Sequence, residues 1–411
     1  MSFAQLGLNP EFLRAVADSG YLVPTPIQQA AIPIILSGRD LMAGAQTGTG
    51  KTAAFVLPIL QKLTNTDSIG TRRSHVRALI LVPTRELAIQ VEQSVITYGS
   101  HAFIRSVAVY GGASLPEQVQ KLEEGAEIIV ATPGRLLDLV WRGNIDFGAT
   151  EFLVLDEADR MLDMGFIDDI RQIIALLPEQ RQNLMFSATF SAGISKLAKT
   201  LLVDPATVQA TPHNSAANLV EHSMLRVEAD RKQEALRQLI VSGVVSSALV
   251  FVRTKHGADR LTNQLARHNI NVAVIHGDKA QSQRIAALEG FKAGRVKILV
   301  ATEVAARGID INSLPYVINY DLPRNAEDYV HRIGRTGRAG IAGKAISLVA
   351  GAELPQLREI EKLLGHQISL QTAEDTSIKQ ADQPRHDRPS KSRQLAPHRS
   401  SSTRARAVVQ A

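Results

Sequence analysis

The fold of this chain is decided by the stretch Ala45-Gln46-Thr47-Gly48-Thr49-Gly50-Lys51-Thr52. Its glycines let the backbone turn with N–H groups pointing inward, and a helix expected over residues 52–60 directs its positive N-terminal end to the same place. Lys51 can then reach the β- and γ-phosphates, and the Thr52 hydroxyl can bind Mg²⁺. Ala45 stands where the usual phosphate-loop pattern has glycine, and the plainer alternative is a glycine-rich turn beside an ordinary helix. The stretch therefore predicts a nucleoside triphosphate site.

An acidic motif follows about a hundred residues later, at the end of an apolar run. Residues 152–155 read Phe-Leu-Val-Leu, as strands buried on both faces of a parallel sheet do, and Asp156-Glu157-Ala158-Asp159 comes next. We expect Asp156 to hold Mg²⁺ and Glu157 to orient or deprotonate the attacking water. A solvated acidic helix start remains a real alternative for Asp159. With the phosphate loop upstream, the first two carboxylates predict hydrolysis of the bound triphosphate.

Strand-like and helix-like segments alternate along the rest of the chain. Helical patterns cover residues 86–98, 115–123 and 354–364. The expected strands lie at 78–82, 106–110, 127–131, 152–155 and 183–186, and again at 248–252, 272–276, 297–301, 316–320 and 344–349. This alternation is typical of parallel sheets with helical crossovers. The sequence therefore predicts an α/β protein with two such domains in tandem.

Domain boundaries follow from shifts in composition. We expect a first domain over residues 1–207, a linker at 208–217, a second domain over 218–368 and a disordered basic tail at 369–411. Residues 381–411 contain seven Lys or Arg against two Asp, a net charge of +5, whereas the whole chain carries +6. The tail is rich in Ser, Pro and Gln and has almost no large apolar residues, which favours disorder. It is either an inert terminus or an electrostatic contact for a polyanion.

Composition excludes several classes of protein. The 411 residues contain no cysteine, which rules out disulfides, thiol nucleophiles and cysteine-based zinc sites. Hydrophobic residues make up 45% of the chain, enough for full cores, yet no apolar run reaches membrane-spanning length and the first residues begin no signal peptide. We therefore expect a cytoplasmic protein without membrane contact.

The second domain has no phosphate loop of its own, but it contains a cluster of cations. The cluster reads His331-Arg332-Ile333-Gly334-Arg335-Thr336-Gly337-Arg338. Guanidinium groups opposite a bound triphosphate stabilise the charge that develops during phosphoryl transfer. An exposed basic helix would explain the cluster alone. The triphosphate site in the first domain, which has no evident arginine of this kind, favours the catalytic interpretation.

Taken together, these motifs resemble those of the DEAD-box ATP-dependent RNA helicases, and the start of the chain resembles the bacterial RhlE branch. The match runs from Phe3 to about Leu364 and implies two RecA-like domains that use ATP and Mg²⁺. By this resemblance Gln28 reads the adenine edge, Phe3 stacks on the ring and Asp310 contacts the nucleotide. The remaining catalytic residues that the resemblance implies are Ser187 and Thr189, which couple hydrolysis to unwinding, His331, and the arginine fingers Arg335 and Arg338.

The resemblance also implies a surface for the RNA backbone. Its expected residues are Pro83, Thr84, Arg85, Gly111, Gly112, Thr132, Pro133, Gly134 and Arg135 in the first domain, and Arg284 and Thr302 in the second. One position departs from the family pattern, because Glu303 stands where Asp is usual. The charge is kept, so we expect ATP binding and hydrolysis to survive, with the coupling between the RNA and ATP sites as the property affected.

The sequence thus predicts an ATP-dependent RNA helicase that unwinds short duplexes locally or remodels RNA–protein complexes. Single strands and short duplexes of RNA would be bound largely without sequence preference. Ribosomal precursors and the RNA-decay machinery are the candidate partners. A DNA helicase or translocase, an RNA clamp that does not unwind, and a metabolic phosphate-loop kinase are the alternatives, in decreasing order of fit.

Overall fold

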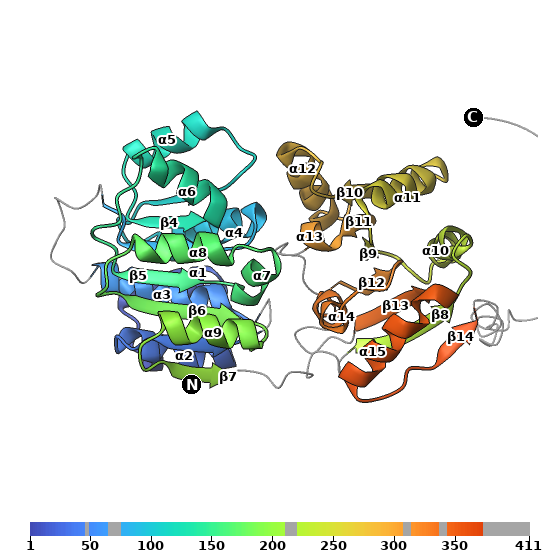
Figure 1. The fold of residues 1–411 in the computed structure, drawn as a ribbon, viewed down its shortest axis with the longest axis horizontal. Coiled ribbons are helices and arrows are strands. Elements are labelled where there is room, and N and C mark those ends of the chain that lie inside the picture. The colour runs from blue at the N-terminus through green and yellow to red at the C-terminus, as the bar shows by residue number, and fades with distance from the viewer. Residues whose placement is uncertain (46–48, 65–74, 210–219, 307–313, 337–342, 373–411) are drawn as a thin grey trace, which may run out of the picture.

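Two α/β domains lie side by side in the computed structural model of this chain (Figure 1). The structure describes residues 1–45, 49–64, 75–209, 220–306, 314–336 and 343–372. Several predicted features fall outside these ranges: Gln46, Thr47 and Gly48 of the phosphate loop, Asp310, Arg338, most of the linker, and the tail beyond residue 372.

The first domain is built on a seven-stranded sheet in which every pairing is parallel. Its strand order is β3-β4-β2-β5-β6-β1-β7. The strands are β1 (Leu41–Gly44), β2 (Ala78–Leu81), β3 (Ser106–Val109), β4 (Ile128–Ala131), β5 (Phe152–Leu155), β6 (Gln182–Ser187) and β7 (Ala206–Gln209). The helices are η1 (Phe3–Leu6), α1 (Pro10–Asp18), α2 (Pro26–Leu36), α3 (Lys51–Thr64), α4 (Arg85–Tyr98), α5 (Leu115–Glu123), α6 (Pro133–Trp141), α7 (Ala158–Asp163), α8 (Ile167–Ala175) and α9 (Ala192–Leu201). Apolar side chains form one core layer with α1 to α4 and another with α6 to α9.

The second domain repeats this architecture, again with parallel pairings throughout. Its strand order is β10-β11-β9-β12-β13-β8-β14. The strands are β8 (Val220–Arg226), β9 (Ala248–Val252), β10 (Val272–Ile275), β11 (Ile298–Thr302), β12 (Tyr316–Asn319), β13 (Gly343–Val349) and β14 (Leu370–Thr372). The helices are α10 (Lys232–Val241), α11 (Lys255–Arg267), α12 (Gln281–Lys292), α13 (Glu303–Ala306), α14 (Ala326–Ile333), η3 (Gly351–Glu353) and α15 (Leu354–Leu364).

Three strands differ from the expectation, and all of them lie at or near the β8 and β7 side of a sheet. Strand β7 falls in the expected connector, so the first domain reaches Gln209, not residue 207. Strand β14 pairs with β8, so the second domain includes residues 370–372, which were assigned to the tail. Strand β8 was not expected as a strand. All three are short or mix polar with apolar residues, because edge positions bury only part of a strand, and they lack the continuous apolar pattern of the central strands.

The parallel sheets bring the functional motifs to one edge of each domain. Because the carboxyl ends of parallel strands meet at the same edge, the segments after β1, β5 and β6 are neighbours in the first sheet. These segments carry the phosphate loop, the acidic motif and the Ser187-Ala188-Thr189 turn. Among the described residues, no helix is both long and apolar enough to cross a bilayer.

Candidate active site

The phosphate loop of the first domain places a buried cation where a triphosphate would bind. Helix α3 begins at Lys51, whose side chain is only 5% exposed and whose Nζ lies 3.8 Å from Asp156 Oδ1. That ammonium group finds no hydrogen-bond acceptor within the described part of the chain. A buried ammonium without acceptors is unfavourable, and phosphate oxygens would supply them. The residues present therefore fit a triphosphate.

Gln28 connects the expected adenine-reading motif to this loop. Its Nε2 donates a hydrogen bond to the Gly50 carbonyl at 3.1 Å, and its Oε1 accepts one from the Thr25 N–H at 2.9 Å. Gly50 has a φ of +92°, and a Cβ atom there would lie 2.5 Å from Gln28 Nε2. The loop needs glycine for both reasons. The adenine contact of Gln28 stays a prediction, but the structure already couples this side chain to the phosphate loop.

Phe3 cannot take the stacking role that was expected of it. Its side chain is 5% exposed and belongs to the apolar core of the first domain, so neither ring face is open to a ligand. Tyr21 is 44% exposed, and its hydroxyl shares a hydrogen bond with that of Tyr98 at 3.2 Å. The sequence did contain this signal, because Tyr21 belongs to the same motif as Gln28.

The acidic pair is buried at the start of α7. Glu157 has a left-handed backbone with a φ of +53°, a conformation that costs roughly 1–3 kcal/mol and is typical of functional sites. Burial raises the pKa of Asp156 to about 6, against the opposing charge of Lys51. Burial acts in the same direction on Glu157, but Arg160, Lys51 and Arg335 outweigh it and hold the pKa of Glu157 at about 2. Glu157 is therefore ionised throughout the physiological pH range.

Asp159 joins the acidic motif to the turn after β6. Its Oδ2 accepts hydrogen bonds from the N–H groups of Ala188 and Thr189 at 3.0 and 2.9 Å and from Thr189 Oγ1 at 3.1 Å. Ser187 Oγ donates to the Thr189 carbonyl at 2.7 Å. The alternative of a solvated helix start is therefore wrong for Asp159, which is 8% exposed. Any movement of α7 must be passed directly to this turn.

A cavity of about 550 Å³ lies between the two domains and brings the predicted catalytic residues together. From the first domain it is lined by Lys51, Glu157, Asp159, Arg160 and Thr189, and from the second by Phe251, Glu303, His331, Arg332 and Arg335, among others. Asp156, Thr52 and Ser187 are not part of this lining. The guanidinium of Arg335 is close enough to help lower the pKa of Glu157, as an arginine finger requires.

The expected RNA residues of the first domain form a separate surface around one loop. Gly112 has a φ of +78°, and a Cβ atom there would come within 2.4 Å of Arg85 Nη1. Arg135 Nη1 donates to the Ala113 carbonyl at 3.3 Å. Thr84 and Thr132 are the N-cap residues of α4 and α6, so two helix N-termini lie on the same edge. Two guanidinium groups and two helix ends suit phosphate groups.

Arg284 occupies a different position from the one expected of a backbone contact. It is buried between the domains, with Nη2 2.8 Å from Glu86 Oε1. Gln281 Nε2 also donates to Glu86 Oε1, at 3.2 Å. Sequence reasoning assigned no role to Glu86, although it lies beside Arg85. The RNA role of Arg284 stays a prediction, as does that of Thr302, which is buried at the end of β11.

Comparison with known proteins identifies the family. The DEAD/DEAH box helicase model matches residues 25–197, and the helicase conserved C-terminal domain matches residues 231–340. The DEAD-box ATP-dependent RNA helicase RhpA of Helicobacter pylori is 42% identical over 369 residues, which cover 90% of this chain and 74% of that protein. This chain belongs to the DEAD-box family of ATP-dependent RNA helicases. Its place in the RhlE branch stays a prediction.

Solved structures confirm the two RecA-like domains and bear on their arrangement. Saccharomyces cerevisiae Dbp5 bound to RNA and ADP BeF3 is similar, with a TM-score of 0.81, 32% identity, and coverage of 92% of this chain and 98% of that one. The same yeast protein bound to Nup159, a Gle1 variant, ip6 and ADP gives a TM-score of 0.62 at 30% identity, with coverage of 92% and 100%. Because the fold is shared, the difference reports how the domains are placed. This chain is nearer to the form that holds RNA and ADP BeF3.

Proposed function

We propose that this helicase hydrolyses ATP with Mg²⁺ in the cavity between its domains and uses the cycle to separate short RNA duplexes locally. One observation carries the proposal: Lys51 and Glu157 of the first domain and Arg335 of the second line the same cavity. Neither domain alone contains the complete set. Hydrolysis would therefore depend on how the domains are placed, which is the property that RNA can control.

The first domain offers the residues that would hold the nucleotide and its metal ion. Lys51 supplies the unsatisfied buried cation, and Thr52 and Asp156 supply oxygen donors of the kind that Mg²⁺ prefers. Two protein oxygens are few, and among the described residues no larger cluster of His, Asp and Glu could hold a metal ion. This fits Mg²⁺ bound with substrate phosphates, where the ion would neutralise charge on the β- and γ-oxygens.

The charges around Glu157 indicate how it acts on water. A carboxylate with a pKa near 2 is a weak base, so orienting the nucleophile suits it better than early proton abstraction. Phosphoryl transfer through a loose transition state asks mainly for positioning and charge stabilisation. Arg160 pairs with Glu157 and fixes its direction, and Arg335 approaches from the other domain.

The two surfaces explain why RNA would stimulate hydrolysis. The Arg85, Gly112 and Arg135 surface would grip backbone phosphates without reading bases. A strand that also contacts the second domain would favour the closed arrangement, in which the catalytic set is complete. By analogy with the family, closure bends one strand and so separates a short duplex, and phosphate release reopens the domains.

ATP hydrolysis with and without RNA, run beside displacement of a short RNA strand, tests this proposal. We expect hydrolysis to rise with RNA and displacement to require ATP. Stimulation by DNA equal to that by RNA would favour a DNA translocase. RNA-stimulated hydrolysis without displacement would favour a clamp. Ribosomal precursors or decay machinery as partners, and a cytoplasmic location, stay predictions.

A further inference from the structure

The cavity residue Arg332 is held in place by groups that lie behind it. It is 4% exposed and has its guanidinium carbon 4.8 Å from the ring centre of Phe251. Its Nε donates to Glu303 Oε2 at 2.5 Å. Its Nη1 donates to Asn319 Oδ1 at 3.1 Å and to the Asp321 carbonyl at 2.8 Å. The donors are thus directed by three elements of the second domain, and the side chain has little freedom to choose another position.

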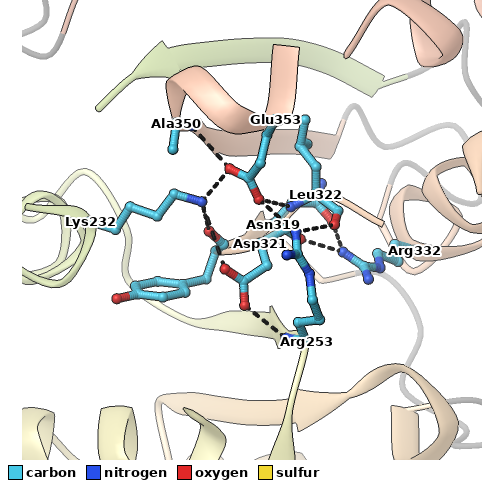
Figure 2. A network of polar contacts seen from close by, with 9 residues as sticks. Lys232, Arg253, Asn319, Asp321, Leu322, Arg332, Ala350 and Glu353 are labelled. Carbon is cyan, nitrogen blue, oxygen red and sulfur yellow. Dashed lines mark hydrogen bonds and ion pairs between the residues drawn. The ribbon is translucent and has the colours of Figure 1, made fainter. Parts of the chain in front are cut away.

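One of these acceptors belongs to a peptide group that is gripped on both sides. The carbonyl of Asp321 accepts from Arg332, and the N–H of the same peptide group, that of Leu322, donates to Glu353 Oε1 at 3.1 Å (Figure 2). A peptide group is planar and rigid, so turning one end turns the other. Hydrogen bonds in such a chain also polarise one another. Glu353 and Arg332 are therefore linked mechanically and electrostatically, although they do not touch.

Glu353 itself is fixed by four hydrogen bonds. Besides Leu322, its carboxylate accepts from the Ala350 N–H at 3.0 Å, from Lys232 Nζ at 2.5 Å and from Arg253 Nη2 at 3.0 Å. These groups come from the ends of β12 and β13, the start of α10 and the end of β9 (Figure 2). Lys232 also donates to the Tyr320 carbonyl at 2.7 Å. A buried carboxylate with four donors and two cations is held in one orientation.

We propose that Glu353 is a positioning residue for ATP hydrolysis, acting through the Asp321–Leu322 peptide group on Arg332 and thereby on α14. Helix α14 carries His331, and Arg335 follows it within one turn of Arg332, so both depend on where Arg332 is anchored. All three line the cavity. Displacement of a catalytic group by about 1 Å can cost roughly a hundredfold in rate. The inference rests on the proposed function of this cavity.

The test is Glu353→Gln, which keeps the shape of the side chain but places an amide N–H₂ against cationic donors. At saturating RNA we expect kcat to fall by about tenfold to a hundredfold, with the KM for ATP nearly unchanged. The first domain, which holds the phosphate loop, is not altered. An unchanged kcat would overturn the inference. Loss of RNA-stimulated hydrolysis in the wild-type chain would instead overturn the proposed function, and this inference with it.

Asp40→Asn is the matched control for a loss of stability alone. Asp40 is a buried carboxylate that accepts from the Asn183 N–H at 2.7 Å, from Asn183 Nδ2 at 3.2 Å and from the Val203 N–H at 2.8 Å. It precedes β1, at the amino-terminal edge of the first sheet, away from the cavity. We expect a lower melting temperature and an unchanged kcat. An equal fall of kcat in both variants would show that Glu353 acts only through stability.

A double-mutant cycle with Arg332→Lys separates the proposed route from any other. If Glu353 acts through Arg332, Glu353→Gln lowers kcat much less in the Arg332→Lys background than in the wild type. Equal fold-losses in the two backgrounds would overturn the route. Should Glu353→Gln not fold, Arg253→Gln removes one of the four bonds from a side chain that is 41% exposed, and a smaller fall of kcat at unchanged KM is expected. No fall would again contradict the inference.

Discussion

Glu157 shows how the surroundings of one residue decide its chemistry. The carboxylate is buried, left-handed in its backbone and paired with Arg160, and three cations keep it ionised. Glu157→Gln keeps the shape and a hydrogen-bonding oxygen but removes the charge. We expect ATP and RNA binding to survive while hydrolysis falls roughly a hundredfold or more. Single-turnover hydrolysis measured beside nucleotide affinity checks this. Near-normal turnover would remove Glu157 from the mechanism.

Gly112 tests the RNA surface through a single methyl group. A Cβ atom at this position would lie 2.4 Å from Arg85 Nη1, so Gly112→Ala must displace that guanidinium. We expect weaker RNA affinity with an unchanged KM for ATP in the absence of RNA. Gly143→Ala is the control, because its φ of +76° brings the same backbone strain while its Cβ meets nothing within 4 Å. Equal effects of the two variants on RNA affinity would assign the loss to strain.

At the scale of elements, the central strands and the phosphate-loop helix could be predicted because each signal is local. Residues 152–155 form β5 as expected, and α3 follows the loop, although it runs to Thr64, beyond the expected residue 60. Edge strands such as β7 and β14 escaped, since their pairing depends on a neighbour that no local pattern reveals.

The site was predictable only where motif letters carry the chemistry. Lys51, Glu157 and Arg335 do meet at one cavity. Phe3 was misplaced because an aromatic letter does not tell whether a ring is stacked on a ligand or packed in a core. Glu353 and Glu86 were missed because their partners lie far away in the sequence, at Lys232 and Arg284 for example.

The packing of α4 on β3 allows a pH test of stability. Glu92 Oε1 accepts from the Ala108 N–H at 2.9 Å, and burial raises the pKa of Glu92 above its usual 4.5. The folded chain thus binds this proton more tightly, and its free energy of unfolding decreases as the pH rises through the raised pKa. Glu92→Gln keeps the acceptor without the charge. We expect it to melt higher than the wild type at pH 8, with a smaller difference at pH 5.

Thermal unfolding of both proteins at the two pH values provides this comparison. A difference in melting temperature that is the same at pH 5 and pH 8 would mean that the charge of Glu92 is not the cause. A lower melting temperature of the variant at both values would mean that the carboxylate stabilises the helix–strand contact.

For the whole molecule, the basic C-terminal segment concerns affinity rather than catalysis. Residues 381–411 carry seven cations and two acids. Each phosphate contact on a single strand adds about 0.7 to the salt slope of binding, so partial engagement would add about 2. We expect deletion of these residues to weaken RNA binding most at low salt and to leave kcat at saturating RNA nearly unchanged. RNA affinity across a salt series decides, and superimposable lines would show the segment to be inert.

The central claim is that the catalytic site is shared by two domains and is completed when they close. Because the chain has no cysteine, Glu123→Cys on α5 and His268→Cys after α11, both at exposed positions, introduce the only two thiols for a fluorescent donor and acceptor. The measurement is energy transfer with no ligand, with RNA, with a non-hydrolysable ATP analogue, and with both. The account predicts a large change only when RNA and the analogue are present together. The same transfer in all four conditions, or the full change with either ligand alone, would contradict it.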